Sequence, residues 1–185
     1  MRWKNNKTAY GAASIGLHWL MLLLLAAVYA CMELRGIYPK GSALRDGIKA
    51  WHYMLGLSVF GLVWLRIGFQ WAGGTPDIKP APPTWQMRIA LPMKLALYAL
   101  MIGMPLLGWS LLSAEGKPIP YFFGWQLAPL IGANKELAAQ IKELHETFGT
   151  LGYFLIGLHA VAALVHHYIV RDNTLRRMLP SRNQP

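Results

Sequence analysis

Four long apolar stretches limit what this chain can fold into. A lipid hydrocarbon core about 30 Å thick is crossed by roughly 20 apolar residues of helix. Because 55% of the 185 residues are hydrophobic and only 14% are charged, little sequence remains for a soluble domain. The sequence therefore predicts an all-α integral membrane protein: a four-transmembrane-helix bundle formed as a single membrane domain over residues 1–185. The spans are expected near 11–32, 48–70, 90–112 and 144–169.

The first stretch has a second interpretation as a signal peptide. Basic residues precede it, and Val28-Tyr29-Ala30-Cys31 resembles a lipoprotein cleavage site. However, the apolar run is longer than the apolar region of a signal peptide, which is about 7–15 residues, and it carries His18 and Trp19. We expect it to be retained as a membrane span.

The basic residues outside the spans suggest an orientation. An even number of helices places both termini on one side of the membrane, and the connector 71–89 lies on that same side. The side of the termini holds nine Lys or Arg and the opposite side seven, which favours cytoplasmic termini and a short basic cytoplasmic tail over 171–185. The nine are Arg2, Lys4, Lys7, Lys79, Arg88, Arg171, Arg176, Arg177 and Arg182, and the seven are Arg35, Lys40, Arg45, Lys49, Lys117, Lys135 and Lys142.

Four histidines, His18, His52, His145 and His159, lie within the apolar stretches. An ionisable side chain at membrane depth is costly and persists where it pairs or binds a cofactor. Fourteen residues of helix between His145 and His159 correspond to about 21 Å and return to within roughly 40° of the same face. One helix therefore offers a ligand to each of two sites. Depth along the spans pairs His52 with His145 and His18 with His159.

Haem b suits these positions, because it needs two opposed imidazoles on neighbouring helices and an apolar slot. Zinc or copper would need ligands clustered around one ion, and the lone Cys31 forms no C-x-x-C-H motif for covalent haem. His166 is an alternative to His159 as the partner of His18. In that case the two ligands on the last span would be His145 and His166, about 31 Å apart. A histidine can also simply bond a carbonyl of a neighbouring helix.

Glycines and cations near these histidines have two interpretations each. Gly56 and Gly149 follow His52 and His145 by four residues and would leave room for a porphyrin, although glycine is common at membrane helix contacts. Arg66 and Lys49 are candidates for pairing with haem propionates, with snorkelling as the alternative for Arg66. The cations around the entry to the second span would attract a small anion or meet lipid phosphates or propionates; they are Arg35, Lys40, Arg45 and Lys49.

Three segments resemble the bacterial cytochrome b561 family, and within it the di-haem superoxide oxidase type. They are Leu17-His18-Trp19, Cys31-Met32-Glu33-Leu34-Arg35-Gly36, and the run LHETFGTLGYFLIGLHAVAALVHHY from Leu144 followed by DNTLRRMLP from Asp172. The resemblance covers nearly the whole chain. It implies a bundle in the bacterial inner membrane with two b haems, ligated at positions matching His18, His52, His145 and His159.

The resemblance also implies an oxidoreductase that oxidises periplasmic superoxide to dioxygen and passes the electrons through two haems to ubiquinone. No catalytic acid, base or nucleophile is expected, because the cofactor carries the chemistry. Expected partners are membrane lipid, superoxide and ubiquinone, and no nucleic acid. Two alternatives stay open. One is a cytochrome b subunit linking quinone to a dehydrogenase, hydrogenase or periplasmic carrier, docked through the aromatic residues of the long 113–143 connector; the other is a structural anchor without redox chemistry.

Overall fold

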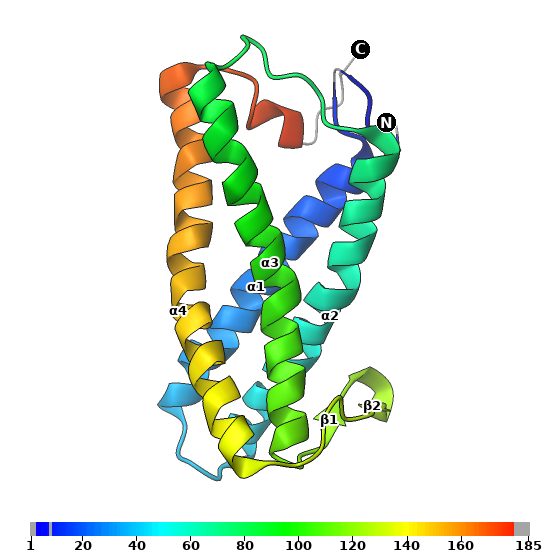
Figure 1. Ribbon diagram of the computed structural model, residues 1–185, viewed down its shortest axis with the longest axis vertical. Helices are drawn as coiled ribbons and strands as arrows, with labels where there is room; N and C mark the ends of the chain where they lie inside the picture. The colour runs from blue at the N-terminus through cyan, green and yellow to red at the C-terminus, as the bar shows by residue number, and fades with distance from the viewer. Residues whose placement is uncertain (1–2, 8, 180–185) are drawn as a thin grey trace. The chain divides into compact units, whose positions relative to one another are not determined.

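Four long helices make up most of the chain (Figure 1). The computed structural model describes residues 3–7 and 9–179. Each of the four helices is long and apolar enough to cross a membrane, which confirms the predicted all-α, four-span class. Their bounds are Ala12–Leu34 for α1, Ala43–Gly73 for α2, Thr84–Ala114 for α3 and Lys135–Val165 for α4. Of the predicted cytoplasmic tail, residues 180–185 lie outside the described part.

Three helices extend well beyond the spans expected from hydropathy. The α2 helix begins at Ala43, where the Ser42 hydroxyl accepts a hydrogen bond from the Arg45 backbone N–H at 3.3 Å. Asn134 caps α4 by accepting from the N–H groups of Glu136 and Leu137, both at 3.1 Å. Such caps fix where a helix starts, whereas hydropathy marks only the part that faces lipid.

The chain divides into two compact units, which we call unit 1 and unit 2. Unit 1 contains the described residues up to 20 together with 62–98 and 151–179, and unit 2 contains 21–61 and 99–150. Each unit includes a segment of every one of the four helices. The expectation of a single membrane domain stays a prediction.

Unit 1 contains both ends of the described chain, which bond to the connector between α2 and α3. The Asp77 N–H donates to the Lys7 carbonyl at 3.0 Å, and Asn173 exchanges two hydrogen bonds with the Lys79 backbone, at 2.8 and 3.0 Å. We call these contacting segments, residues 3–7, 9–10, 74–80 and 172–179, the terminal clasp. The clasp fixes three separate segments of the chain at one end of unit 1.

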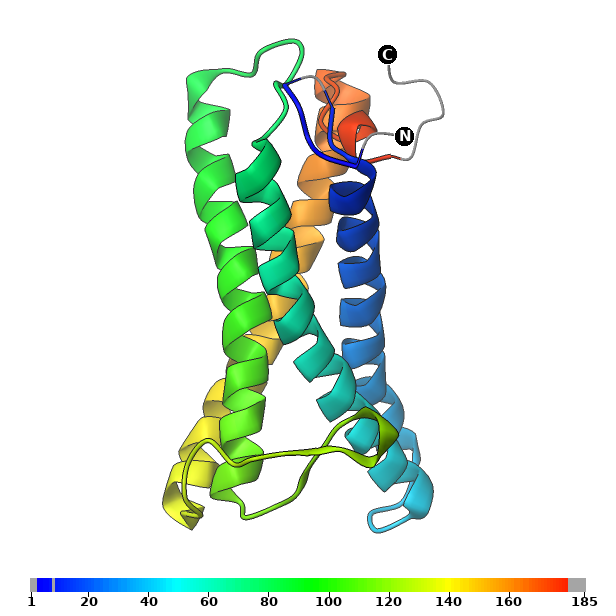
Figure 2. The same ribbon diagram turned by 90° about the vertical axis from the view of Figure 1, so that its right-hand side faces the viewer.

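Unit 2 contains a short antiparallel hairpin between α3 and α4, formed by strands β1 (Ile119–Pro120) and β2 (Gln126–Leu127). Ile119 pairs with Leu127 and is buried with Leu57 of α2 and Leu112 of α3. Figure 2 shows the hairpin beside the part of α2 that belongs to this unit. The hairpin is therefore packed against the helices and is not a free loop.

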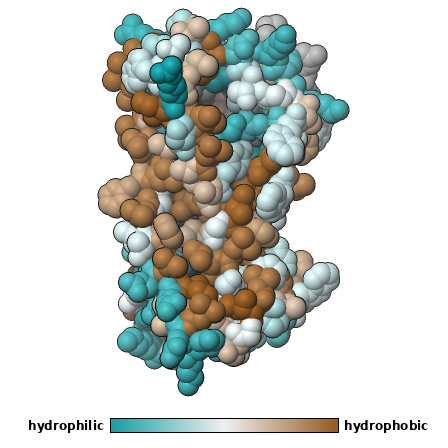
Figure 3. All heavy atoms as spheres, in the orientation of Figure 1, coloured by the Kyte–Doolittle hydropathy of each residue, from teal (hydrophilic) through white to brown (hydrophobic). Residues whose placement is uncertain are grey.

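The outward surface of the helices is strongly apolar. Figure 3 shows apolar side chains along the helices on the visible face and hydrophilic ones gathered at helix ends. Leu23 and Phe154, both within spans, are 67% and 72% exposed. Exposure of this kind matches a lipid environment, because lipid rather than protein covers the apolar faces of a membrane bundle.

Candidate functional site

In unit 2, His52 on α2 faces His145 on α4. The centres of their rings lie 6.1 Å apart, and the ring planes are inclined by 75°. His52 Nδ1 lies 3.0 Å from the Val28 carbonyl, which fixes that nitrogen as the donor and leaves Nε2 free. His145 Nδ1 is buried. Two facing imidazoles of this kind can supply the two axial nitrogens of one metal ion.

In unit 1, His18 on α1 faces His159 on α4 in nearly the same geometry. The ring centres are 6.3 Å apart, again with an inclination of 75°. These two pairs are the ones that depth along the spans predicts. That the four imidazoles bind iron stays a prediction.

The separation within each pair fits two ligands on opposite sides of one metal. An imidazole nitrogen bonds a metal at about 2 Å, so two opposed rings on one ion have centres roughly 6 Å apart. Among the described residues, no group of three or more His, Cys, Asp or Glu could hold a metal ion. The donor set thus fits a cofactor that supplies its own equatorial ligands, as a b-type haem does.

Two glycines lie one helical turn after the histidines of the unit 2 pair. A Cβ added at Gly56 would meet nothing within 4 Å, and one at Gly149 would touch only Met104, at 3.5 Å. Gly108 on α3 has a different position, because a Cβ there would lie 3.3 Å from His145 Cε1. Gly108 was missed by the sequence reasoning, although a glycine in mid-span at a helix contact is a usable signal.

Arg66 is the cation associated with the unit 1 pair. Its charge acts on both His18 and His159, and its Nη1 atom is buried without a hydrogen-bond partner in the described part of the chain. A buried guanidinium is stabilised by an anion. The propionates of a b-type haem are anions of suitable chemistry, so Arg66 fits the role suggested by the sequence.

A polar chain in unit 1 lies close to Arg66 and was not foreseen. Tyr98 donates to Gln70 at 3.0 Å, and Gln70 donates to Thr75 at 3.1 Å. Tyr10 bonds to Thr75 and feels the charge of Arg66; burial raises the pKa of Tyr10 and keeps its hydroxyl neutral. These residues are far apart in the sequence, so no local sequence pattern predicts their hydrogen bonds.

His166, the rival ligand, is bonded elsewhere. It begins a π-helical turn, His166–Val170, and its Nδ1 lies 2.5 Å from the carboxylate of Asp172. Asp172 is buried; although burial works to raise its pKa, the bonds from His166 and the Thr174 N–H hold that pKa below its usual value. In this structure His166 is bonded to Asp172 of the terminal clasp, whereas His159 is the residue that faces His18.

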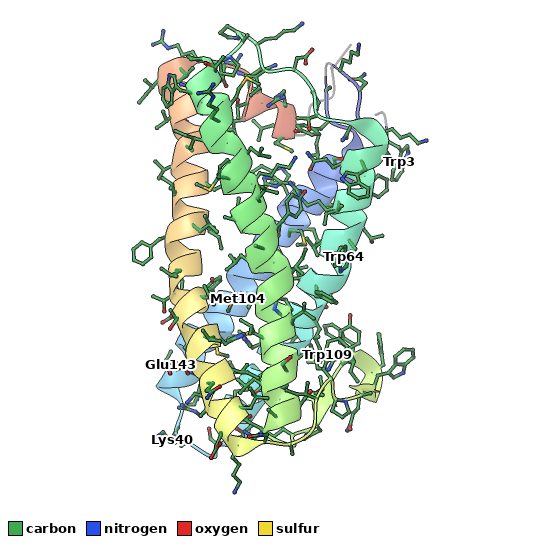
Figure 4. All side chains as sticks on the ribbon, viewed as in Figure 1. Trp3, Lys40, Trp64, Met104, Trp109 and Glu143 are labelled. Carbon is green, nitrogen blue, oxygen red and sulfur yellow. The ribbon has the colours of Figure 1, made fainter. Side chains whose placement is uncertain are left out.

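The four predicted steering cations have unequal freedom. Arg45 donates to the carbonyls of Arg35 and Tyr38, at 3.0 and 2.8 Å, and so braces the α1–α2 connection. Lys49 forms an ion pair with Asp46 at 2.7 Å. Lys40 is exposed in the loop that connects α1 to α2 (Figure 4). The charge of Arg35 acts on His52. Arg45 lies on α2 itself, not in the loop before the predicted span 48–70.

A four-helix membrane bundle with facing imidazoles on neighbouring helices has the architecture of a b-type membrane cytochrome. Comparison with known proteins agrees. The family model described as prokaryotic cytochrome b561 matches residues 9–181. The chain belongs to this family of bacterial membrane electron-transfer proteins, which bind b-type haem.

Three relatives match over nearly their full lengths. Cytochrome b561 homolog 1 of Escherichia coli (strain K12) is 44% identical over 173 residues, covering 94% of this chain and 98% of the relative. The probable superoxide oxidase CybB of Yersinia pestis is 36% identical over 173 residues, covering 94% and 97%. Cytochrome b561 homolog 2 of Escherichia coli (strain K12) is 30% identical over 184 residues, covering 97% and 95%.

Proposed function

We propose that this protein is a di-haem superoxide:ubiquinone oxidoreductase of the bacterial inner membrane. One b haem would be held by His52 and His145 and the other by His18 and His159. The observation that carries the proposal is the presence of two imidazole pairs with ring centres 6.1 and 6.3 Å apart. The name of the Yersinia pestis relative, a probable superoxide oxidase, supports the choice of substrate.

The reaction balances without an acid, base or nucleophile from the chain. Two superoxide anions each lose one electron and become dioxygen, while one ubiquinone gains two electrons and two protons and becomes ubiquinol. Bound haem supplies the one-electron transfer between these substrates. The chain itself holds the cofactors, sets their electrostatic surroundings and controls access.

Unit 2 would contain the superoxide side. We place the α1–α2 and α3–α4 connections in the periplasm and both termini in the cytoplasm, following the distribution of basic residues. Arg35, whose charge acts on His52, and the exposed Lys40 would attract the anion. The Val28 carbonyl holds the His52 ring in one tautomer, so its Nε2 stays available as a ligand.

Unit 1 would hold the second haem. The Arg66 charge acts on His18 and His159 and favours a reduced, more negative cofactor between them. Trp19, next to His18, donates from Nε1 to the Met178 carbonyl at 2.6 Å, which ties the pair to the terminal clasp. A ubiquinone site is not assigned to particular residues.

A second function, electron transfer to or from a docked partner protein, is favoured by one observation. The tip of the hairpin between α3 and α4 exposes Phe123 and Trp125, at 99% and 73%. Large exposed aromatic side chains are characteristic of binding surfaces. A dehydrogenase, hydrogenase or small periplasmic carrier would be the partner.

The two functions are separated by mixing purified, haem-loaded protein with superoxide under anaerobic conditions in a stopped-flow instrument. We expect rapid haem reduction at a rate that falls as ionic strength rises. The rate should also fall in Arg35→Gln but not in Arg88→Gln, a cation of α3 outside unit 2. A rate that is negligible, or unaffected by salt and by Arg35→Gln, would favour the partner-docking function.

A further inference from the structure

The hairpin between α3 and α4, residues 119–127, has an ordered backbone. We call it the aromatic hairpin. The Tyr121 N–H donates to the Trp125 carbonyl at 2.7 Å, and the Trp125 N–H donates to Phe122 at 3.3 Å. Trp109 of α3 donates from its indole to the Ala128 carbonyl at 3.0 Å (Figure 4). Much of the hairpin backbone is therefore bonded within the protein, as backbone close to lipid must be.

The aromatic hairpin runs back along α2. Ile119 is buried against Leu57, and the Phe122 ring centre lies 5.8 Å from that of Trp51. The hydroxyl groups of Tyr121 and Ser58 lie 3.4 Å apart. All three α2 residues belong to the membrane span Ala43–Gly73.

These contacts define the depth that the hairpin reaches. The last charged residue before the apolar part of α2 is Lys49, and no charged residue follows until Arg66. Ser58 lies nine residues after Lys49, which is about 14 Å along the helix. The hairpin therefore folds back along α2, and the Tyr121 side chain reaches an uncharged stretch of that helix instead of projecting away from it.

The exposed side of the hairpin is aromatic and uncharged. Phe123 is 99% exposed, and its backbone is left-handed, with φ 60° and ψ 27°, a conformation that is unfavourable for a bulky side chain. Trp125 is 73% exposed and the adjoining Trp51 51%. The sequence contains no charged residue from 118 to 134. A strained backbone thus holds an apolar ring outward within a charge-free segment.

We propose that the aromatic hairpin is a membrane-interface anchor whose occupant is lipid, at the boundary between headgroups and acyl chains. Its exposed rings continue the lipid-facing surface of α2 at Trp51. Aromatic side chains are enriched at this level of the bilayer, and residues 118–134 contain no charged side chain that would have to leave water there. The inference does not require superoxide oxidase activity, but it removes Phe123 and Trp125 as a docking surface for a partner protein.

The test places a nitroxide on Phe123→Cys in a Cys31→Ser background, with the haem-loaded protein in phosphatidylcholine nanodiscs. Lys40→Cys, in the exposed α1–α2 loop, is the matched control. We expect the label at 123 to collide more with oxygen than with a water-soluble nickel chelate, and the label at 40 to show the reverse. The nickel accessibility at 123 should be several-fold below that at 40. Equal nickel accessibility at both positions would overturn the proposal and make the hairpin a solvent-facing docking surface.

A second measurement leaves Phe123 intact. Trp125→Phe and the unsubstituted protein are compared in vesicles containing phosphatidylcholine brominated near the top of its acyl chains. We expect the fluorescence attributable to Trp125 to be quenched by the brominated lipid. If that fluorescence is the same in brominated and ordinary lipid, the anchor does not exist.

Discussion

The two histidine pairs are almost identical in geometry and different in surroundings. Their ring centres are 6.1 and 6.3 Å apart, with the same inclination of 75°. In unit 2 a backbone carbonyl fixes His52, and Gly108 allows close approach of His145. In unit 1 the pair lies in the field of Arg66. The spacing of the histidines along the helices therefore sets the geometry of each pair. Neighbouring residues make the two sites different.

Removing a ligand should have the largest effect and should act on one site at a time. We expect His145→Ala to lose up to half of the bound haem, because the unit 2 haem would lose one of its two axial bonds to iron. His159→Ala should lose the other half. The measurement is haem content per chain by pyridine haemochrome assay, with His167→Ala as the control that retains both. If either ligand variant keeps its full complement, the assignment of the pairs fails.

Arg66→Leu should shift one reduction potential and leave the other in place. The positive charge of Arg66 favours the reduced cofactor, so its loss should lower the potential of the unit 1 haem. A tenfold change in the one-electron equilibrium is about 59 mV, and we expect a shift of that order. Spectroelectrochemical titration is the measurement, and Arg66→Lys should recover most of the potential because it retains the charge. If both reduction potentials are unchanged in Arg66→Leu, Arg66 does not distinguish the two haem sites electrostatically.

Gly108→Ala should disturb only the unit 2 pair. The added Cβ would lie 3.3 Å from His145 Cε1, so the imidazole must move by a few tenths of an ångström. We expect a changed low-spin signal for one haem in electron paramagnetic resonance spectra and partial haem loss, smaller than in His145→Ala. Gly47→Ala, where a Cβ meets nothing within 4 Å, is the control. Equal changes in both haem signals would contradict the prediction that Gly108 acts on the unit 2 pair alone.

Acid should loosen the terminal clasp of unit 1 through Asp172. The pKa of Asp172 is held below its usual value. The resulting stabilisation is complete above the unfolded-state pKa of about 3.9, and it is lost as the pH falls through the lower folded-state pKa. Asp172→Asn should remove this dependence and, by losing a buried charged hydrogen bond, cost about 1–3 kcal/mol. Hydrogen exchange of residues 172–179 against pH is the measurement; identical profiles for the two proteins would contradict the role of Asp172.

The sequence predicted the helices and the histidine pairs because both depend on local periodicity. Fourteen residues between His145 and His159 suffice to put two ligands on one face of a helix. The start of α4 at Lys135 depends instead on the Asn134 cap, which hydropathy does not detect. The contacts of Asp172 with His166, and the approach of Gly108 to His145, depend on how separate segments pack. Such contacts could not be predicted from residue types and spacing.

The steering cations show the same limit. Arg35, Lys40, Arg45 and Lys49 are equivalent by charge and position in the sequence. The structure separates them, because Arg45 bonds two carbonyls and Lys49 pairs with Asp46. Charge counts therefore predict a basic region, whereas the residues free to meet an anion emerge only from the hydrogen bonds.

The central claim is that two pairs of imidazoles each hold a b haem. The most direct measurement combines haem content per folded chain with electron paramagnetic resonance of the oxidised, haem-saturated protein. The account predicts two haems per chain, both low-spin with two imidazole ligands. A saturated, folded preparation with a single haem, or with a high-spin centre lacking a second imidazole, would contradict it.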